Sequence, residues 1–171
     1  MSANVYQPHV MVLPEDDANR ELANGFLLDP ALNPRAIQVL PIAGGWAKVR
    51  DEFAASQVAL LRKYPKRHLV LLIDFDGQVA ERIEIFQKVF PADVRDRVYL
   101  LGTQDEPEPL RKDCGISLEK IGERLAQACA HGEPGLWTHA MLAHNQAELD
   151  RLIRNVKPFL FRSDWRSRAG S

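Results

Sequence analysis

With 171 residues, 46% of them hydrophobic and 26% charged, and a formal net charge of −1, the chain has the composition of an ordinary globular protein of one domain. Its two cysteines, Cys114 and Cys129, are too few for a disulfide framework and lack the spacing of metal ligands, which favours a reduced, cytoplasmic protein. No apolar run approaches the roughly 20 residues of a transmembrane helix, so we expect no membrane association.

Short apolar segments alternate with helical patterns through the first part of the chain. Four segments rich in Val, Ile and Leu have the pattern of buried strands, at residues 10–13, 37–42, 69–73 and 98–101. The apolar spacing between them predicts three helices, at residues 18–28, 48–64 and 78–89. This βαβαβαβ order predicts an α/β fold, Rossmann-like, with a mostly parallel four-stranded sheet flanked by helices.

The chain changes character after the fourth predicted strand. Residues 104–109 are acidic and contain prolines, so we expect a loop there. A helix is predicted at residues 117–129 with Ser117 as its N-cap, and residues 137–156 have a mainly helical pattern. We therefore expect an α/β core at residues 1–103 and a C-terminal helical extension at residues 104–171, packed on the core within one structural domain.

Acidic residues follow two of the predicted strands. Asp74 and Asp76 come after the third strand, and Glu15 comes after the first. The carboxyl ends of parallel strands meet at the edge of the sheet where ligands bind, so we expect these carboxylates to converge. Residues i and i+2 of an extended segment point the same way, which would direct Asp74 and Asp76 to one ion. Converging carboxylates repel one another, and Mg²⁺ and Mn²⁺ prefer oxygen ligands, so the pattern predicts a divalent-metal site.

The same residues have plainer interpretations. A DxD sequence at a strand end is common in turns and caps, and Glu15 begins an acidic segment that would suit a helix N-terminus. Asp16, Asp17 and Asn19 are better placed for that capping role. Glu15 is then left nearest the strand end, where neighbouring carboxylates would raise its pKa and suit it to general acid or base chemistry.

Two further groups of residues are candidates for the site. Glu106 and Glu108 follow the fourth strand and would complete an acidic cluster if that strand lies beside the third, although a solvated loop is the alternative. Gly44 and Gly45 follow the second strand, where backbone N–H groups would bind a phosphate with help from Lys48. An ordinary tight turn also explains the two glycines.

In combination, Glu15 after the first strand, Gly44-Gly45 after the second and Asp74-x-Asp76 after the third resemble the Toprim domain of topoisomerases, bacterial primases, recombination mediators and OLD-family nucleases. The resemblance covers residues 10–102. It implies that Glu15 is the general acid/base, that Asp74 and Asp76 hold Mg²⁺ or Mn²⁺, and that Glu106 or Glu108 supplies an acid for a second metal. Asp16 stands where the family usually has Gly.

The resemblance also implies a function. A small stand-alone Toprim protein is most similar to the OLD-type nucleases, some of which act in phage defence or in mobile-element modules. We therefore expect a metal-dependent nuclease that hydrolyses phosphodiester bonds of DNA or RNA and binds mainly to backbone phosphates. An ATPase partner acting in trans and a homo-oligomer are both compatible with this expectation.

A second resemblance is local. Residues 73–77 are similar to the first motif of haloacid dehalogenase phosphatases, although Gln78 stands where that family has Thr. This interpretation would make Asp74 the nucleophile and Asp76 the general acid/base. Thr103 would be a residue of the second motif. In that family the motif lies at the start of the fold, whereas in this chain two βα units come before it.

A third interpretation is not enzymatic. The chain would be a Toprim-like scaffold that binds a partner protein through its C-terminal helices. Trp137, Trp165 and the apolar residues 159–161 would form the binding surface.

Overall fold

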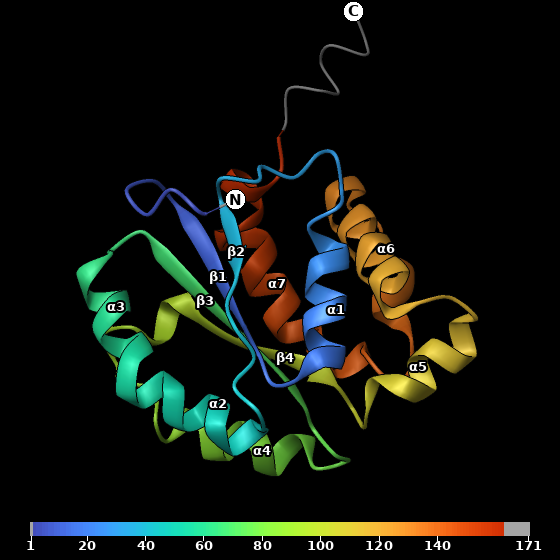
Figure 1. The fold of residues 1–171 in the computed structure, drawn as a ribbon, viewed down its shortest axis with the longest axis horizontal. Helices are drawn as coiled ribbons and strands as arrows, with labels where there is room; N and C mark the ends of the chain where they lie inside the picture. The colour runs from blue at the N-terminus through green and yellow to red at the C-terminus, as the bar shows by residue number, and fades with distance from the viewer. Residues whose placement is uncertain (1, 163–171) are drawn as a thin grey trace, which may run out of the picture.

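The computed structural model describes residues 2–162, and its strands form one parallel sheet in the order β2-β1-β3-β4 (Figure 1). The four strands are β1 (His9–Pro14), β2 (Ile37–Val39), β3 (Arg67–Asp74) and β4 (Val98–Thr103). Helices cover both faces of the sheet. The α/β fold class and the parallel four-stranded sheet expected from the sequence are therefore confirmed.

Two groups of helices cover the sheet. One face carries α2 (Trp46–Glu52), a π-helical turn (Phe53–Gln57), α3 (Val58–Lys63) and α4 (Val79–Gln87). The other face carries α1 (Asp17–Phe26), α7 (Gln146–Asn155) and α8 (Lys157–Leu160), while α6 (Leu118–His131) packs on α1 and α5 (Pro107–Cys114) packs on α6. Short 3-10 turns lie at Arg95–Arg97, Gly135–Thr138 and Ala143–Asn145. None of the described helices is both long enough and apolar enough to span a membrane.

Alternate residues of each strand face opposite layers. In β3, Leu69 and Leu71 pack against the layer of α2, α3 and α4, whereas Val70 packs against the layer of α1, α7 and α8. In β1, Met11 and Val12 divide in the same way. Because both faces are covered, both sets of residues are apolar, and the strands read as continuous apolar runs in the sequence.

The helical extension approaches the core closely at two glycines. A Cβ at Gly122 of α6 would overlap the carbonyl oxygen of Leu22, and a Cβ at Gly25 of α1 would overlap the carbonyl oxygen of Glu119. Glycine is needed at both positions, because any side chain would push the two helix backbones apart. Leu22 and neighbouring side chains of α6 then form a buried apolar cluster between the two helices.

The apolar residues expected to form a partner surface lie mostly inside the fold. Trp137 is buried, and its indole N–H donates to the carbonyl oxygen of Leu125 at 3.1 Å. Leu160 is buried and Phe159 is half-buried against the same side of the sheet. Phe159 and Leu160 pack against the sheet, and Trp137 packs in the apolar cluster between α1 and α6, so these side chains do not form an open surface. Trp165 lies outside the described residues.

Several segments differ from the expected secondary structure. The strand expected at residues 37–42 ends at Val39, and the helical stretch expected from residue 137 has only 3-10 turns before α7 begins at Gln146. Residues 107–109, expected in a loop, begin helix α5, because Pro107 at the first helical position has a suitable φ and no N–H to leave unpaired. The helix expected at residues 48–64 is interrupted by the π-helical turn Phe53–Gln57. A π-turn keeps the helical apolar pattern on either side of it, so the sequence gives no separate sign of it.

Side chains at the start of α7 cover the outer edge of β4. The amide of Asn145 accepts from the N–H of Gly102 at 3.1 Å and donates to the carbonyl oxygen of Gly102 at 2.9 Å, as a neighbouring strand would. Further along the edge, Glu148 accepts from a backbone N–H of β4 and Arg151 donates to a backbone carbonyl of β4. Three side chains thus satisfy groups that an unpaired edge strand would leave open.

Replacing Asn145 by Leu should destabilise the fold, because the N–H and carbonyl groups of Gly102 would both lose their partners in a buried position. An unsatisfied buried polar group costs about 1–3 kcal/mol, so we expect the free energy of unfolding, measured by urea denaturation, to fall by at least about 2 kcal/mol. Gln146→Leu is the control, because Gln146 is exposed and bonds to Asp150 within α7. Equal losses in the two variants would contradict this account of the edge.

Candidate metal centre

The register of β1 and β3 determines where the acidic residues lie. Pro14 pairs with Leu72, and the N–H of Glu15 continues the ladder by donating to the carbonyl oxygen of Leu72 at 2.9 Å. Asp74 is the last residue of β3, so Glu15 leaves the sheet directly beside it. The structure therefore brings together Glu15 and Asp74, as the positions of the strand ends predicted.

Backbone N–H groups hold the carboxylate of Glu15, which is buried. Its Oε2 accepts from the N–H of Asp74 at 2.7 Å, and the N–H of Trp46 at the start of α2 donates to the same carboxylate. The backbone carbonyl of Glu15 accepts from the N–H groups of Gly44 and Gly45, at 2.8 and 3.2 Å. The loop after β2 thus folds around Glu15, with φ values of 97° and 144° at the two glycines that other residues rarely adopt.

Asn19 links the two remaining carboxylates. Asp16 is the N-cap of α1 and accepts from the N–H of Asn19 at 3.0 Å. The side-chain amide of Asn19, which is fully buried, donates to Asp16 Oδ1 at 3.0 Å and to Asp74 Oδ1 at 2.9 Å. Its amide oxygen has no hydrogen-bond partner among residues 2–162. Asn19 therefore fixes the position of Asp16 relative to Asp74.

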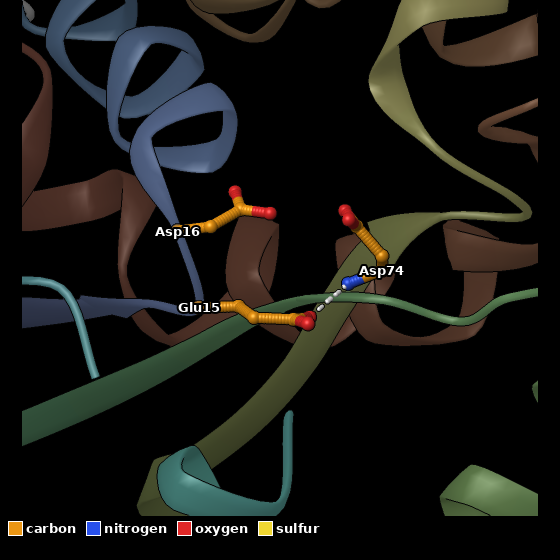
Figure 2. Close-up of side chains that lie close together, drawn as sticks. All are labelled: Glu15, Asp16 and Asp74. Carbon is orange, nitrogen blue, oxygen red and sulfur yellow. Dashed lines mark hydrogen bonds between the residues drawn. The ribbon is translucent and has the colours of Figure 1, made fainter. Parts of the chain in front are cut away.

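The three carboxylates form one group. Figure 2 shows Asp16 and Asp74 facing each other across a gap that Glu15 borders, and one oxygen from each residue lies within 4.8 Å of the other two. Burial raises the pKa of Glu15 and raises the pKa of Asp74 to about 7, and neighbouring carboxylates add to both shifts.

This group has the chemistry of a divalent-cation site. Within residues 2–162, no Lys, Arg or His side chain forms a salt bridge with Glu15, Asp16 or Asp74. The negative charge of the ionised group is therefore not balanced by the protein. Mg²⁺ or Mn²⁺ would balance it and would accept carboxylate oxygens as ligands. The residues present fit such an ion.

The structure does not bring Asp76 into this group. The strand ends at Asp74, and Asp76 has a left-handed backbone with a φ of 52°, so the alternation that would align the two aspartates no longer applies. Asp76 instead pairs with Arg82 of α4 at 3.0 Å. The guanidinium of Arg82 stacks on Trp46, 3.8 Å from the ring centroid. Metal binding by Asp76 stays a prediction that would require this ion pair to open.

Glu106 and Glu108 also lie outside the group. Glu106 is exposed at the N-cap of α5, and Glu108 pairs with Arg111 on the same helix. Strand β4 does lie beside β3, as the prediction required. However, the helix that begins at Pro107 directs both glutamates along its own surface, so their role at a second metal stays a prediction.

The loop expected to bind a phosphate has another contact in the structure. The N–H groups of Gly44 and Gly45 donate to the backbone of Glu15, as described above. Lys48 is exposed, and its Nζ lies beside Gly44, 3.7 Å from the position that a Cβ on Gly44 would take. Of the three residues predicted to bind phosphate, Lys48 is therefore the one whose polar group is not used in these backbone hydrogen bonds.

Sequence reasoning assigned Asp16 and Asn19 to the helix cap and not to the site. Asp16 does cap α1 by accepting from the N–H of Asn19, and α1 begins at the strand end where the acids converge, so the cap itself forms one wall of the site. The spacing of Asp16 and Asn19 is the available indication, since an N-cap side chain bonds to the N–H of the residue three positions later and so lies beside that residue.

Comparison with known proteins does not extend this description. The chain matches no protein-family model, no curated protein and no solved structure. The inference of function therefore rests on the residues and on their geometry.

Without divalent metal, the carboxyl of Asp74 should make the folded protein less stable as the pH rises. Its pKa is about 7 in the folded protein and 3.8 in its ordinary state, so folding takes up a proton between these values. The contribution of this carboxyl to the free energy of unfolding falls over that range and is constant above it. Asn resembles the protonated form, so the stability of Asp74→Asn relative to the wild type should increase over the same range.

Urea unfolding in the presence of a chelator, at a series of pH values, measures this difference. One carboxyl changes the difference by at most about 1.4 kcal/mol per pH unit. Saturating Mg²⁺ should reduce the difference at neutral pH, because the ion stabilises the ionised wild type. A difference that does not vary with pH would show that the pKa of Asp74 is not raised.

Proposed function

We propose that the protein is a divalent-metal-dependent nuclease of the Toprim type, which hydrolyses phosphodiester bonds of DNA or RNA. The observation that carries the proposal is the group of Glu15, Asp16 and Asp74, three carboxylates within 4.8 Å of one another at the carboxyl edge of a parallel sheet. Ligands of open α/β sheets bind at this edge. Mg²⁺ or Mn²⁺ is the cofactor that suits such a set of oxygen ligands.

Asp16 and Asp74 are the first metal ligands in this proposal, because their carboxylates face the same gap and share the Asn19 amide as a donor. Bound there, the metal would polarise a phosphate, neutralise developing negative charge and activate a water molecule. Asn19 would keep the two ligands in position. A nucleic acid would otherwise be repelled by the acidic group, so we expect substrate binding to depend on the metal.

Glu15 is the residue that transfers a proton in this proposal. Burial raises the pKa of Glu15, so its carboxyl takes up a proton more readily than an ordinary glutamate does, which suits it to proton transfer. The N–H groups of Asp74 and Trp46 hold the carboxylate in one orientation. The Toprim resemblance assigns the same role to Glu15, and it adds Asp76 as a ligand once the contact with Arg82 opens. An ATPase acting in trans and a role in phage defence stay proposals that rest on the resemblance.

Glu15→Gln and Asp74→Asn should each reduce Mg²⁺- or Mn²⁺-dependent cleavage of supercoiled plasmid and of single-stranded nucleic acid by at least about a hundredfold. The two variants should differ in metal binding, which electron paramagnetic resonance of Mn²⁺ measures. Asp74→Asn removes a ligand and should weaken Mn²⁺ binding, whereas Glu15→Gln removes proton transfer and should retain most of it.

Asp17→Asn is the matched control. It makes the same change of charge beside the site, at an exposed residue that pairs with Arg20, and it should leave cleavage unchanged. A folded wild type that binds Mn²⁺ but cleaves neither DNA nor RNA would contradict the nuclease proposal. Hydrolysis of a small phosphomonoester by that protein would instead favour the phosphatase interpretation, in which Asp74 is the nucleophile.

A further inference from the structure

A groove lies beside the loop whose glycines, Gly44 and Gly45, contact the backbone of Glu15. The groove, of about 600 Å³, opens between the segment that follows β2 and the helical stretch formed by α2 and the π-helical turn. Leu40 and Ile42 line it from the β2 side, and Ala55 lines it from the π-helical turn. The groove therefore has largely apolar walls, together with the carboxylate of Asp51, which pairs with Arg50 at 3.2 Å. Its volume is that of a small-molecule site.

One end of the groove carries hydrogen-bond acceptors. A π-helix bonds residue i to residue i+5, so the turn Phe53–Gln57 brings Glu52 and Gln57 onto one side, where the Gln57 amide nitrogen lies 3.4 Å from Glu52 Oε1. Gln57 is only 5% exposed, and its amide oxygen has no hydrogen-bond partner in the described part of the chain. Such a buried unsatisfied acceptor is costly and calls for a ligand or another partner. The terminal torsion of Gln is soft, so this amide can turn toward an occupant.

The other end of the groove carries a cation. Lys48 lines the groove and lies beside Gly44, whose N–H donates to the backbone of Glu15. Among the salt bridges of residues 2–162, none involves Lys48. The groove thus has a positive group beside Gly44, mainly apolar walls with the ion-paired Asp51, and acceptors where Glu52 and Gln57 lie.

We propose that this groove binds one nucleotide of the substrate, with a phosphate at Lys48 and a guanine base against Glu52 and Gln57. A nucleotide carries groups that complement the groove in the same order. These are an anionic phosphate for the lysine, flat base faces for the apolar walls, and N–H donors on the base edge for the acceptors. Guanine places two donors side by side, N1–H and N2–H₂, whereas the other bases place an acceptor next to their donor. The inference rests on the proposed nuclease function and gives it a base preference at the nucleotide beside the cleaved bond.

Isothermal titration of the four nucleoside monophosphates GMP, AMP, CMP and UMP, without divalent metal, tests the groove separately from cleavage. GMP should bind at least about tenfold more tightly than the other three, since a good base contact discriminates by about 1–3 kcal/mol. Glu52→Gln should remove the preference for GMP, and Gln57→Leu should weaken it. Lys48→Met should weaken binding of GMP but not of guanosine, which lacks the phosphate.

Glu84→Gln is the control for a lost surface carboxylate, because Glu84 pairs with Lys88 on α4 outside the groove, and it should not change GMP binding. Equal affinity for the four nucleotides, or GMP binding unchanged in both Glu52→Gln and Lys48→Met, would overturn the groove inference. The two proposals fail separately. Selective GMP binding without any cleavage would overturn the nuclease alone, and metal-dependent cleavage without GMP binding would overturn the groove alone.

Discussion

The parallel register of β1 and β3 is the constraint on which the rest of the site depends. It places the first residue after β1 beside the last residue of β3, and both residues are acidic. Burying two like charges side by side is unfavourable unless N–H donors or a cation compensate for the lost water. The N–H donors come from three directions: the backbone of β3, the loop before α2, and the side chain of Asn19 in α1. They organise the carboxylates without neutralising them, and that is the condition in which a divalent cation binds well.

Glu15 connects the acidic group mechanically to the groove. Its backbone carbonyl holds Gly44 and Gly45, and its side chain contacts the N–H of Trp46. The same segment continues backward into the wall of the groove and forward to Lys48. A ligand that shifts this loop would therefore shift the Glu15 carboxylate as well. The Arg82 guanidinium stacked on Trp46 couples Asp76 to the same segment, so two of the acidic residues, Glu15 and Asp76, are connected to one loop.

The strands and the meeting of Glu15 with Asp74 were predictable, because buried parallel strands have a clear apolar pattern and their carboxyl ends must share an edge. Asp76 could not be placed, since the left-handed turn that redirects it depends on contacts with β4 and α4. Asn19 was assigned to the helix cap, but it is the residue whose N–H Asp16 caps, and it becomes part of the site only through the tertiary position of α1. The π-turn that aligns Glu52 with Gln57 is set by packing and leaves no pattern in the sequence.

The covering of the β4 edge by α7 has a consequence for how the chain is made. Synthesis proceeds from the N-terminus, so β4 leaves the ribosome before residues 104–144, and Asn145, Glu148 and Arg151 emerge only after them. Until then β4 is an unpaired edge strand, which is the kind of surface that pairs with other chains. The edge of β4 is thus covered only after α7 has been synthesised. A chain that stops before α7 would leave this edge exposed to pairing with other chains.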